Sequence, residues 1–371
     1  MAPGLVCPNC DRTYPAEPEE PWRCDCGSPL ELPAPTLPER PIEADARRGL
    51  WAFEELLPVS REVSLGEGST PLVDAPEWDA AFKLEYVFPT GSFKDRGATT
   101  LLSRASTLGV SRVLEDSSGN AGAAVATYAA RAGIDAEIYV PADAKASKLA
   151  AIERAGARPV RIEGSREAVT GACVEAVERG EGWYASHAWN PAFFAGTQTV
   201  AFEIAAQRGW EAPDALVLPL GHGTLFLGAY RGFRTLEEAG WIDSLPRLLG
   251  AQADGYAPIV AALHDGSEED EDGRNDLADG IQIREPVRKE EILEAIEATG
   301  GDAIAVPEDA TERELKGLHR AGFFVEPTAA AAPAALREYR ERGVIGEDED
   351  VVVPLTGSGL KAEWGHSSES A

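Results

Sequence analysis

The sequence predicts an α/β fold in which a mostly parallel sheet is covered by helices on both sides. Two observations carry this prediction: short apolar runs alternate with longer Ala-rich segments, and several of the runs end in glycine-rich loops. Such alternation is typical of parallel strands joined by helices. In sheets of this kind ligands bind beyond the carboxyl ends of the strands, so these loops are the candidate functional segments.

The predicted elements follow one another in the order that this architecture requires. The first helix is expected at residues 98–108, which are rich in Ala and Leu. The sequence contains no internal repeat. Strands are expected at 113–114, 136–140, 159–162, 215–218 and 351–353, and further helices at 121–132, 145–155 and 166–179.

Residues 1–33 form a separate unit that is built around cysteines. Cys7 and Cys10 precede Cys24 and Cys26, with almost nothing apolar between the two pairs. So short a segment cannot fold on a core of its own, whereas two thiolate pairs can complete a tetrahedral Zn²⁺ site whose binding energy stabilises the fold. We therefore predict a structural zinc-ribbon-like segment. Two disulfides are the alternative, which a reducing cytoplasm disfavours.

Composition narrows the classes of function. The net charge of −29 argues against nucleic acid, because no basic stripe is present. No apolar run approaches the roughly 18 residues of a membrane span, and the start of the chain lacks the features of a signal peptide, so a cytoplasmic protein without a membrane partner is expected. Acidic residues are spread along the chain and only seven lysines stand against 27 arginines. This pattern indicates adaptation to high salt, with an ordinary acidic enzyme as the alternative.

One Pro-rich stretch and one acidic stretch are interpreted as a linker and a loop. Residues 32–41 are rich in proline and mark a boundary after the cysteine segment. Residues 265–276 (DGSEEDEDGRND) read most simply as a solvated loop. A calcium site there is disfavoured, because the required spacing of ligands and glycine is missing.

Lys94 is the most informative residue of the chain. It lies in the segment Pro-Thr-Gly-Ser-Phe-Lys-Asp-Arg-Gly, residues 89–97, between a turn and the helix predicted at 98–108. A primary amine at a helix entrance can form a Schiff base with a carbonyl cofactor. A lone lysine would more simply be an ordinary surface residue, but lysine is scarce in this chain.

Three further loops follow predicted strands. Residues 117–120 (Ser-Ser-Gly-Asn) open a helix, where backbone amides attract an anion such as a carboxylate. Residues 221–224 (Gly-His-Gly-Thr) would surround a phosphate with amides and a hydroxyl. The Thr356 hydroxyl, after the last strand, could hydrogen-bond a ring nitrogen. Taken singly, each loop is explained equally well as a turn or a helix cap.

Together these segments resemble the pyridoxal-phosphate (PLP) site of the tryptophan-synthase-β-like, or fold type II, enzyme family. Within it the chain is most similar to threonine synthases, which carry the cysteine segment, the Lys94 motif, the Ser-Ser-Gly-Asn loop and a Thr-Gly-Ser-Gly-Leu-Lys motif like that of residues 356–361 in the same order. Residues 66–72 (GEGSTPL) resemble a further family motif. The resemblance, which runs from Cys7 to about Trp364, implies a two-subdomain fold. The implied divisions are a catalytic domain at 34–366, a smaller subdomain nested at about 90–190, and a polar tail at 367–371.

The resemblance also implies a role for each candidate residue. Lys94 would carry the Schiff base and move protons, Asn120 would contact the ring hydroxyl of PLP, and Thr356 its ring nitrogen. A homodimer is expected, since dimers are common in this family. The implied assignments are cofactor binding by Lys94, Asn120, Gly221, His222, Gly223, Thr224 and Thr356, substrate binding by Ser117, Ser118 and Gly119, and zinc binding by Cys7, Cys10, Cys24 and Cys26.

The activity implied is that of a threonine synthase, which forms threonine and phosphate from O-phosphohomoserine and water. The alternative is a related PLP lyase that performs β-elimination or β-replacement on another amino acid, of the serine/threonine dehydratase type. Phe193 stands where the family commonly has Arg, and Gln198 where it has Lys, so cations expected for the substrate phosphate are missing. Arg96 and Lys148 are candidates to replace them.

Overall fold

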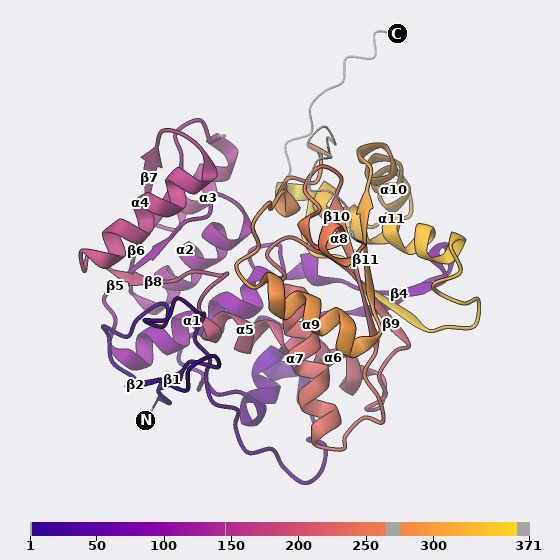
Figure 1. The fold of residues 1–371 in the computed structure, drawn as a ribbon, viewed down its shortest axis with the longest axis horizontal. Helices are drawn as coiled ribbons and strands as arrows, with labels where there is room; N and C mark the ends of the chain where they lie inside the picture. Colours follow the sequence, from indigo (N-terminus) through magenta and orange to yellow (C-terminus); the bar gives the residue numbers. More distant parts are fainter. Residues whose placement is uncertain (1, 145, 265–274, 362–371) are drawn as a thin grey trace.

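The larger of two main sheets has six strands, and helices cover both of its faces. The computed structural model describes residues 2–144, 146–264 and 275–361 (Figure 1). The strand order is β11-β10-β9-β12-β4-β3, and every neighbouring pair is parallel except β3 with β4. The strands are β3 (Leu72–Ala75), β4 (Ala80–Lys83), β9 (Ala215–Pro219), β10 (Arg247–Ala253), β11 (Asp302–Val306) and β12 (Val351–Pro354).

Alternating residues of β9 explain why both faces are covered. Leu216 and Leu218 belong to a core shared with α6, α7 and α9, whereas Ala215 and Val217 belong to a second core shared with α10 and α11. Side chains of a strand point alternately to opposite faces, so a strand that is apolar at every position needs a helix layer on each side. The helices of this part are α6 (Thr199–Gln207), α7 (Thr224–Glu238), α8 (Pro258–Leu263), α9 (Lys289–Thr299), α10 (Glu308–Arg320) and α11 (Pro327–Glu341).

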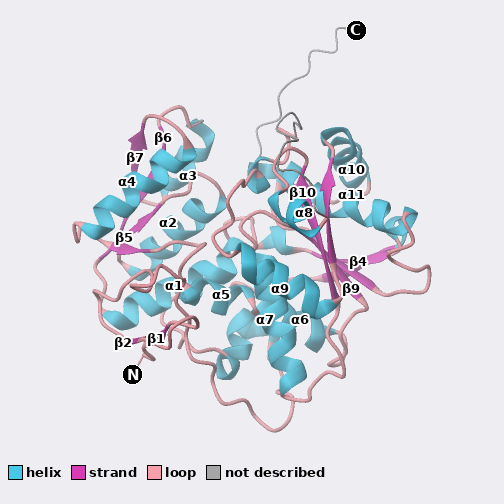
Figure 2. Ribbon diagram, in the orientation of Figure 1, coloured by secondary structure: helices cyan, strands magenta, loops and turns pink. Residues whose placement is uncertain are grey.

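The smaller sheet has four parallel strands in the order β7-β6-β5-β8. It lies beside the larger one, as Figure 2 shows, with its own helices packed against it. The elements are β5 (Arg112–Glu115), α2 (Asn120–Ala132), β6 (Asp135–Pro141), α3 (Ala146–Arg154), β7 (Arg158–Ile162), α4 (Arg166–Glu178) and β8 (Trp183–Tyr184). The predicted α/β alternation is confirmed in both sheets.

Two helices pack backbone against backbone near the middle of the molecule. They are α1 (Lys94–Leu108) and α5 (Pro191–Thr197). A Cβ at Gly196 would lie 1.8 Å from the Arg96 carbonyl oxygen, and one at Gly97 would lie 2.4 Å from the Phe193 ring. Glycine at both positions therefore permits the close approach that fixes α1 between the sheets. Short 3₁₀ helices complete the fold at Ala46–Leu56, Pro76–Trp78, Glu85–Val87, Asp279–Ile281 and Gly359–Lys361.

The cysteine segment forms a two-stranded antiparallel hairpin, β1 (Leu5–Val6) and β2 (Thr13–Tyr14), that is docked on the rest of the chain. Glu20 pairs with Arg104 of α1, and both side chains are buried. Glu31 pairs with Arg231 of α7 and with Arg288. The predicted boundary near residue 33 is thus crossed by ion pairs, and the division into domains stays a prediction.

Two expectations meet the limits of what the structure describes. Most of the acidic run, residues 265–274, lies outside the described residues, as do the side chain of Lys148 and the polar tail. None of the described helices is both long and apolar enough to cross a membrane.

Candidate active site

One cavity of about 580 Å³ collects the predicted functional loops. It is bordered by the segment after β5 of the smaller sheet and by the segments after β9 and β12 of the larger one, all at the carboxyl ends of parallel strands. This is the edge at which α/β sheets bind ligands. The predicted residues that line it are Lys94, Ser117, Ser118, Gly119, Asn120, Gly221, His222, Gly223, Thr224 and Thr356.

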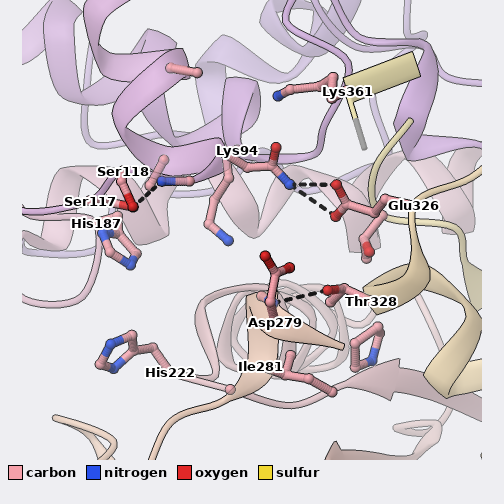
Figure 3. Close-up of a pocket in the computed structure, with 18 of the residues that line it drawn as sticks. Lys94, Ser117, Ser118, His187, His222, Asp279, Ile281, Glu326, Thr328 and Lys361 are labelled. Carbon is pink, nitrogen blue, oxygen red and sulfur yellow. Dashed lines mark hydrogen bonds between the residues drawn. The ribbon is translucent and has the colours of Figure 1, made fainter. Parts of the chain in front are cut away.

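Lys94 is the first residue of α1, and its amine points into the cavity toward the space bordered by His187, His222 and Asp279 (Figure 3). Its Nζ lies 4.1 Å from the centroid of the Phe93 ring. Burial lowers the pKa of Lys94 to about 8, while the Glu326 carboxylate acts in the opposite direction. A substantial fraction of the amine is therefore neutral near physiological pH, as a nucleophile or a base requires.

The loop of residues 117–120 turns sharply into α2. A Cβ at Gly122 would lie 1.8 Å from the Ser117 carbonyl oxygen, so only glycine allows the loop to fold back on the helix. The Gly119 N–H donates to the Ser117 hydroxyl at 3.3 Å. Because α2 begins at Asn120, its N-terminal amides and the positive end of its dipole face the cavity, where they favour an anion.

The loop of residues 221–224 makes the corresponding entrance to α7. Gly223 has a φ of 76° and precedes Thr224, the first residue of the helix. A Cβ at Gly223 would lie 2.6 Å from Ile292 Cδ1, and together with the positive φ this contact disfavours any other residue. A second helix N-terminus thus opens toward the cavity, and its amides are suited to a phosphate.

Thr356 presents a buried hydroxyl that has no partner among the residues described. The side chain is 3% exposed, and its Oγ1 makes no hydrogen bond to any described group. Buried hydroxyls are normally hydrogen-bonded, so an unpartnered one beside a cavity indicates a polar atom of a ligand. A pyridine nitrogen would satisfy it. The residues around the cavity therefore fit PLP.

Several residues to which the sequence assigned no role also line the cavity. Glu326 is the N-cap residue of α11, and it accepts from Asn120 Nδ2 at 2.9 and 3.1 Å. A Cβ at Gly357 would lie 2.2 Å from Glu326 Oε1, so that glycine makes room for the carboxylate. Burial raises the pKa of Glu326. Residues 326–329 (Glu-Pro-Thr-Ala) resemble a family element, but that resemblance assigned no role to the carboxylate. The others include Asp116, Arg166, His187, Asp279 and Lys361.

The structure corrects the interpretation of Phe193 and Gln198. Neither residue lines the cavity. Phe193 is fully buried in the core beside Gly97, and its ring lies behind His187 with 6.1 Å between centroids. The phenylalanine therefore adds no surface to the cavity.

Arg96 is likewise not available to a substrate phosphate. It is fully buried, its Nε lies 2.6 Å from Glu85 Oε2, and its Nη1 lies 2.8 Å from Glu203 Oε1. Glu203 also pairs with the buried Lys83 at 2.9 Å. The guanidinium balances two buried carboxylates, which would otherwise be strongly destabilising.

Comparison with known proteins identifies the family. A model of the pyridoxal-phosphate dependent enzymes matches residues 63–357. The chain belongs to this family. A threonine synthase of Methanocaldococcus jannaschii is 34% identical over 374 residues, which is 96% of this chain and 92% of the relative. A threonine synthase of Methanosarcina acetivorans is 37% identical over 326 residues, or 84% of this chain and 80% of the relative.

Solved structures of other proteins share the fold of this chain. Maize serine racemase matches with a TM-score of 0.71 at 22% identity, over 88% of this chain and 95% of that one. Threonine deaminase isoform 2 from Solanum lycopersicum matches with a TM-score of 0.70 at 22% identity, over 89% and 92% of the two chains. These likenesses show the fold alone, and they confirm the prediction of the α/β fold type II architecture.

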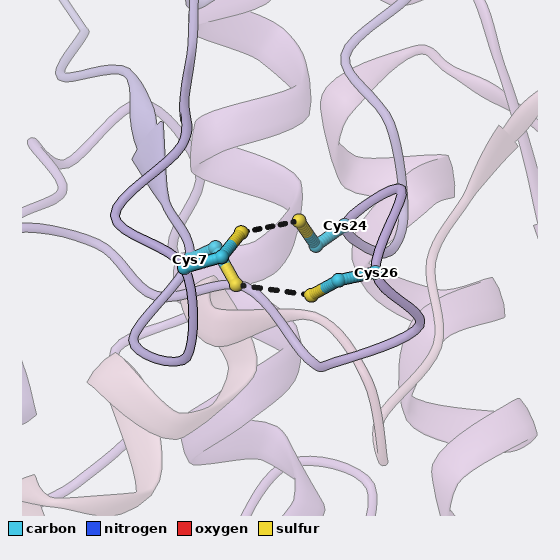
Figure 4. Close-up of side chains that lie close together, drawn as sticks. Cys7, Cys24 and Cys26 are labelled. Atoms are coloured by element: carbon cyan, nitrogen blue, oxygen red, sulfur yellow. Dashed lines mark hydrogen bonds between the residues drawn. The ribbon is translucent and has the colours of Figure 1, made fainter.

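A cluster of four cysteines lies outside this cavity, in the N-terminal cysteine segment (Figure 4). The sulfur atoms of Cys7, Cys10, Cys24 and Cys26 all lie within 4.8 Å of one another. Cys7 Sγ is 3.6 Å from Cys26 Sγ, and Cys10 Sγ is 3.5 Å from Cys24 Sγ, so neither contact is a disulfide. The fifth cysteine, Cys173, is buried in α4.

Proposed function

We propose that this chain is a threonine synthase that uses PLP to convert O-phosphohomoserine and water into threonine and phosphate. One observation carries the proposal: the loops that the sequence links to threonine synthases meet around a single cavity that contains the Lys94 amine. The likeness to threonine synthases over 96% of the chain supports the same reaction.

Four parts of the cavity lining would hold the cofactor. Lys94 would bind its aldehyde, and the loop of residues 221–224, at the N-terminus of α7, would bind its phosphate. The unpartnered Thr356 hydroxyl would meet its ring nitrogen, and Asn120 its ring hydroxyl. A neutral hydroxyl partner leaves the ring less electron-withdrawing than a carboxylate partner would.

PLP, when bound, stabilises negative charge that develops on substrate carbons. The side chains then have to orient the substrate and move protons. Lys94 Nζ, whose pKa is about 8, can take a proton from a substrate carbon and return one near neutral pH. Ser117, Ser118 and Gly119, at the N-terminus of α2, would bind the substrate carboxylate.

The four clustered cysteines would hold a structural zinc ion. A Zn–S bond of about 2.3 Å in a tetrahedral site places the sulfurs roughly 3.8 Å apart, and the two S–S contacts of 3.5 and 3.6 Å fit that geometry. Four thiolates leave no open position, so the ion would stabilise the hairpin and take no part in catalysis. The homodimer, the cytoplasmic location and the adaptation to salt stay predictions.

A PLP lyase for an amino acid with an uncharged side chain is the second candidate. It is favoured by one observation: the segment that carries Phe193 and Gln198 brings no cation to the cavity, and Arg96 is paired elsewhere. A substrate phosphate would then depend on other cations that line the cavity, such as Arg166 and Lys361.

Turnover of the PLP-loaded enzyme on separate substrates decides between the two. We expect threonine and phosphate to appear together from O-phosphohomoserine, with the Lys94→Ala variant as the inactive control. A 2-oxo acid from threonine or serine, without any product from O-phosphohomoserine, would establish the lyase and refute the synthase. The assay should contain high KCl, in view of the net charge of −29.

A further inference from the structure

Two histidines meet on one side of the cavity, close to Lys94. His187 follows β8 and His222 follows β9, and their ring centroids are 5.5 Å apart with the planes at 79°. His187 is 6% exposed. The Nδ1 atom of His222 is buried and makes no hydrogen bond to any described group. Figure 3 shows both imidazoles beside the space into which the Lys94 amine points.

A buried carboxyl group contacts His187, the first of the two histidines. Glu115 is the last residue of β5, and its Oε1 lies 2.7 Å from His187 Nδ1. Its other oxygen is buried without a described partner. Burial raises the pKa of Glu115 well above its usual value, and burial together with the neighbouring His222 lowers the pKa of His187. Both shifts favour the uncharged forms of Glu115 and His187.

The second histidine is neutral as well. Burial, together with the positive charges of Arg166 and Lys94, lowers the pKa of His222 to about 3. Arg166 is the first residue of α4, and it is exposed where it lines the cavity. The titratable and charged groups that border the imidazole pair are Lys94 from α1, Glu115 and Asp116 at the end of β5, Arg166 from α4, Asp279 from the segment before β11, and Glu326 before α11.

A neutral imidazole pair that shares its cavity with a guanidinium is suited to an anion that brings its own charge. A dianion bound against the rings favours their protonated form, and each protonated ring then donates from both nitrogens. Arg166 supplies permanent charge at the same place. Of the two cations that the sequence suggested, Arg96 cannot do so, because it pairs with Glu85 and Glu203. The side chain of the other, Lys148, lies outside the described residues.

We propose that His187 and His222, together with Arg166, form an anion subsite that takes up a proton from solvent when a dianionic group binds. The inference rests on the proposed function, for which it assigns the place of the substrate's side-chain phosphate. The cofactor phosphate is assigned to the backbone amides of residues 221–224 and is present throughout. Since the proton enters with the anion, affinity is highest at low pH and falls as the pH rises.

The test measures proton uptake by the PLP-loaded enzyme when it binds inorganic sulfate, and separately inorganic phosphate. Sulfate is the decisive probe, because it keeps the same charge over the whole pH range. Titration calorimetry in buffers of different ionisation enthalpy gives the number of protons taken up. We expect about one proton per sulfate and an affinity that falls by up to about tenfold per pH unit above neutrality. The cofactor absorbance, recorded in parallel, should stay unchanged, which excludes displacement of PLP.

Matched histidine variants locate the proton. His187→Asn and His222→Asn should each remove most of the uptake and the pH dependence. His264→Asn, at a half-exposed histidine that pairs with Asp302, should retain both. Uptake that persists in both subsite variants would overturn the proposal. So would sulfate that binds the wild type without a proton, or no binding of either anion; these two results require no variant to fold.

Turnover of O-phosphohomoserine by the wild type separates the two claims. Turnover without proton-linked sulfate binding would leave the synthase standing and refute the subsite. Proton-linked binding without turnover would refute the synthase and leave the subsite standing.

Discussion

At the scale of single residues, the chemistry depends on a lysine whose amine is partly neutral at physiological pH. Lys94 lies at a helix start inside a partly enclosed cavity, and burial lowers its pKa to about 8. The ordinary pKa of a lysine side chain is near 10.4. The lowered pKa brings Lys94 into the range in which an amine can act as a base near neutral pH.

This pKa predicts how the apoenzyme recaptures its cofactor. The rate of covalent PLP binding should rise with pH and level off above a midpoint of about 8, because the neutral amine is the reactive form. Absorbance of the bound cofactor measures it, and borohydride reduction should fix the label to the peptide that contains Lys94. Lys94→Ala should lose at least about a thousandfold in activity, whereas Lys316→Ala, at an exposed lysine, should not. A midpoint near 10, or label on another peptide, would contradict the assignment.

Thr356 predicts a variant that separates folding from cofactor binding. Its hydroxyl has no partner among the described groups, so Thr356→Val should leave the melting temperature of the apoenzyme unchanged or raise it. The PLP-loaded variant should lose about tenfold to a hundredfold in activity, as expected for one hydrogen bond. A fall in apoenzyme stability with unchanged activity would mean that the hydroxyl is structural.

The sequence predicts the residues that lie in local loop motifs and misses those that only the tertiary structure brings together. Ser117 to Asn120 and residues 221–224 each follow a strand and open a helix, so a short segment carries the signal. Glu326 reaches Asn120 across more than 200 residues of sequence. Phe193 gives a further example, since the sequence does not show that α5 lies outside the lining of the cavity.

At the scale of elements, close helix contacts hold α1 in place. The helix begins at Lys94, four residues before the start expected at residue 98, while β5 and α2 lie within a few residues of their predicted bounds. The early start matters, because it fixes the amine to a rigid helix. Apolar periodicity did not indicate it, since residues 94–96 are charged.

The contact of α1 with α5 can be tested with two helical glycines. Gly97→Ala would force a Cβ to 2.4 Å from the Phe193 ring, and overpacking of this kind costs about 1–3 kcal/mol. Gly317→Ala in α10, where the nearest atom is 3.9 Å away, should be neutral or stabilise by up to about 1 kcal/mol. Denaturant unfolding measures both. Equal free energies of unfolding for the two variants would contradict the packing described here.

At the scale of the whole molecule, the N-terminal cysteine segment contacts elements beside both of the main sheets. Glu20 reaches Arg104 beside the smaller sheet, Glu31 reaches Arg231 and Arg288 beside the larger one, and Trp22 packs edge-on against Trp189. Ordering of the hairpin by zinc would therefore stabilise contacts beyond the hairpin itself.

Metal removal tests that coupling. Cys24→Ser should release zinc, increase hydrogen exchange within residues 2–33 and lower the melting temperature by about 5 °C, an order-of-magnitude figure for loss of a few stabilising contacts. Cys173→Ala, which changes the cysteine outside the cluster, should keep the metal. Full loss of zinc with unchanged melting and exchange would refute a structural role.

The origin of the product oxygen tests the central claim most directly. The PLP-loaded enzyme is supplied with O-phosphohomoserine in water enriched in the oxygen-18 isotope, and the label in both products is measured by mass spectrometry. A threonine synthase breaks the carbon–oxygen bond to phosphate, so we predict solvent oxygen in threonine and none in phosphate. Labelled phosphate together with unlabelled homoserine would reveal simple phosphate-ester hydrolysis and contradict the account.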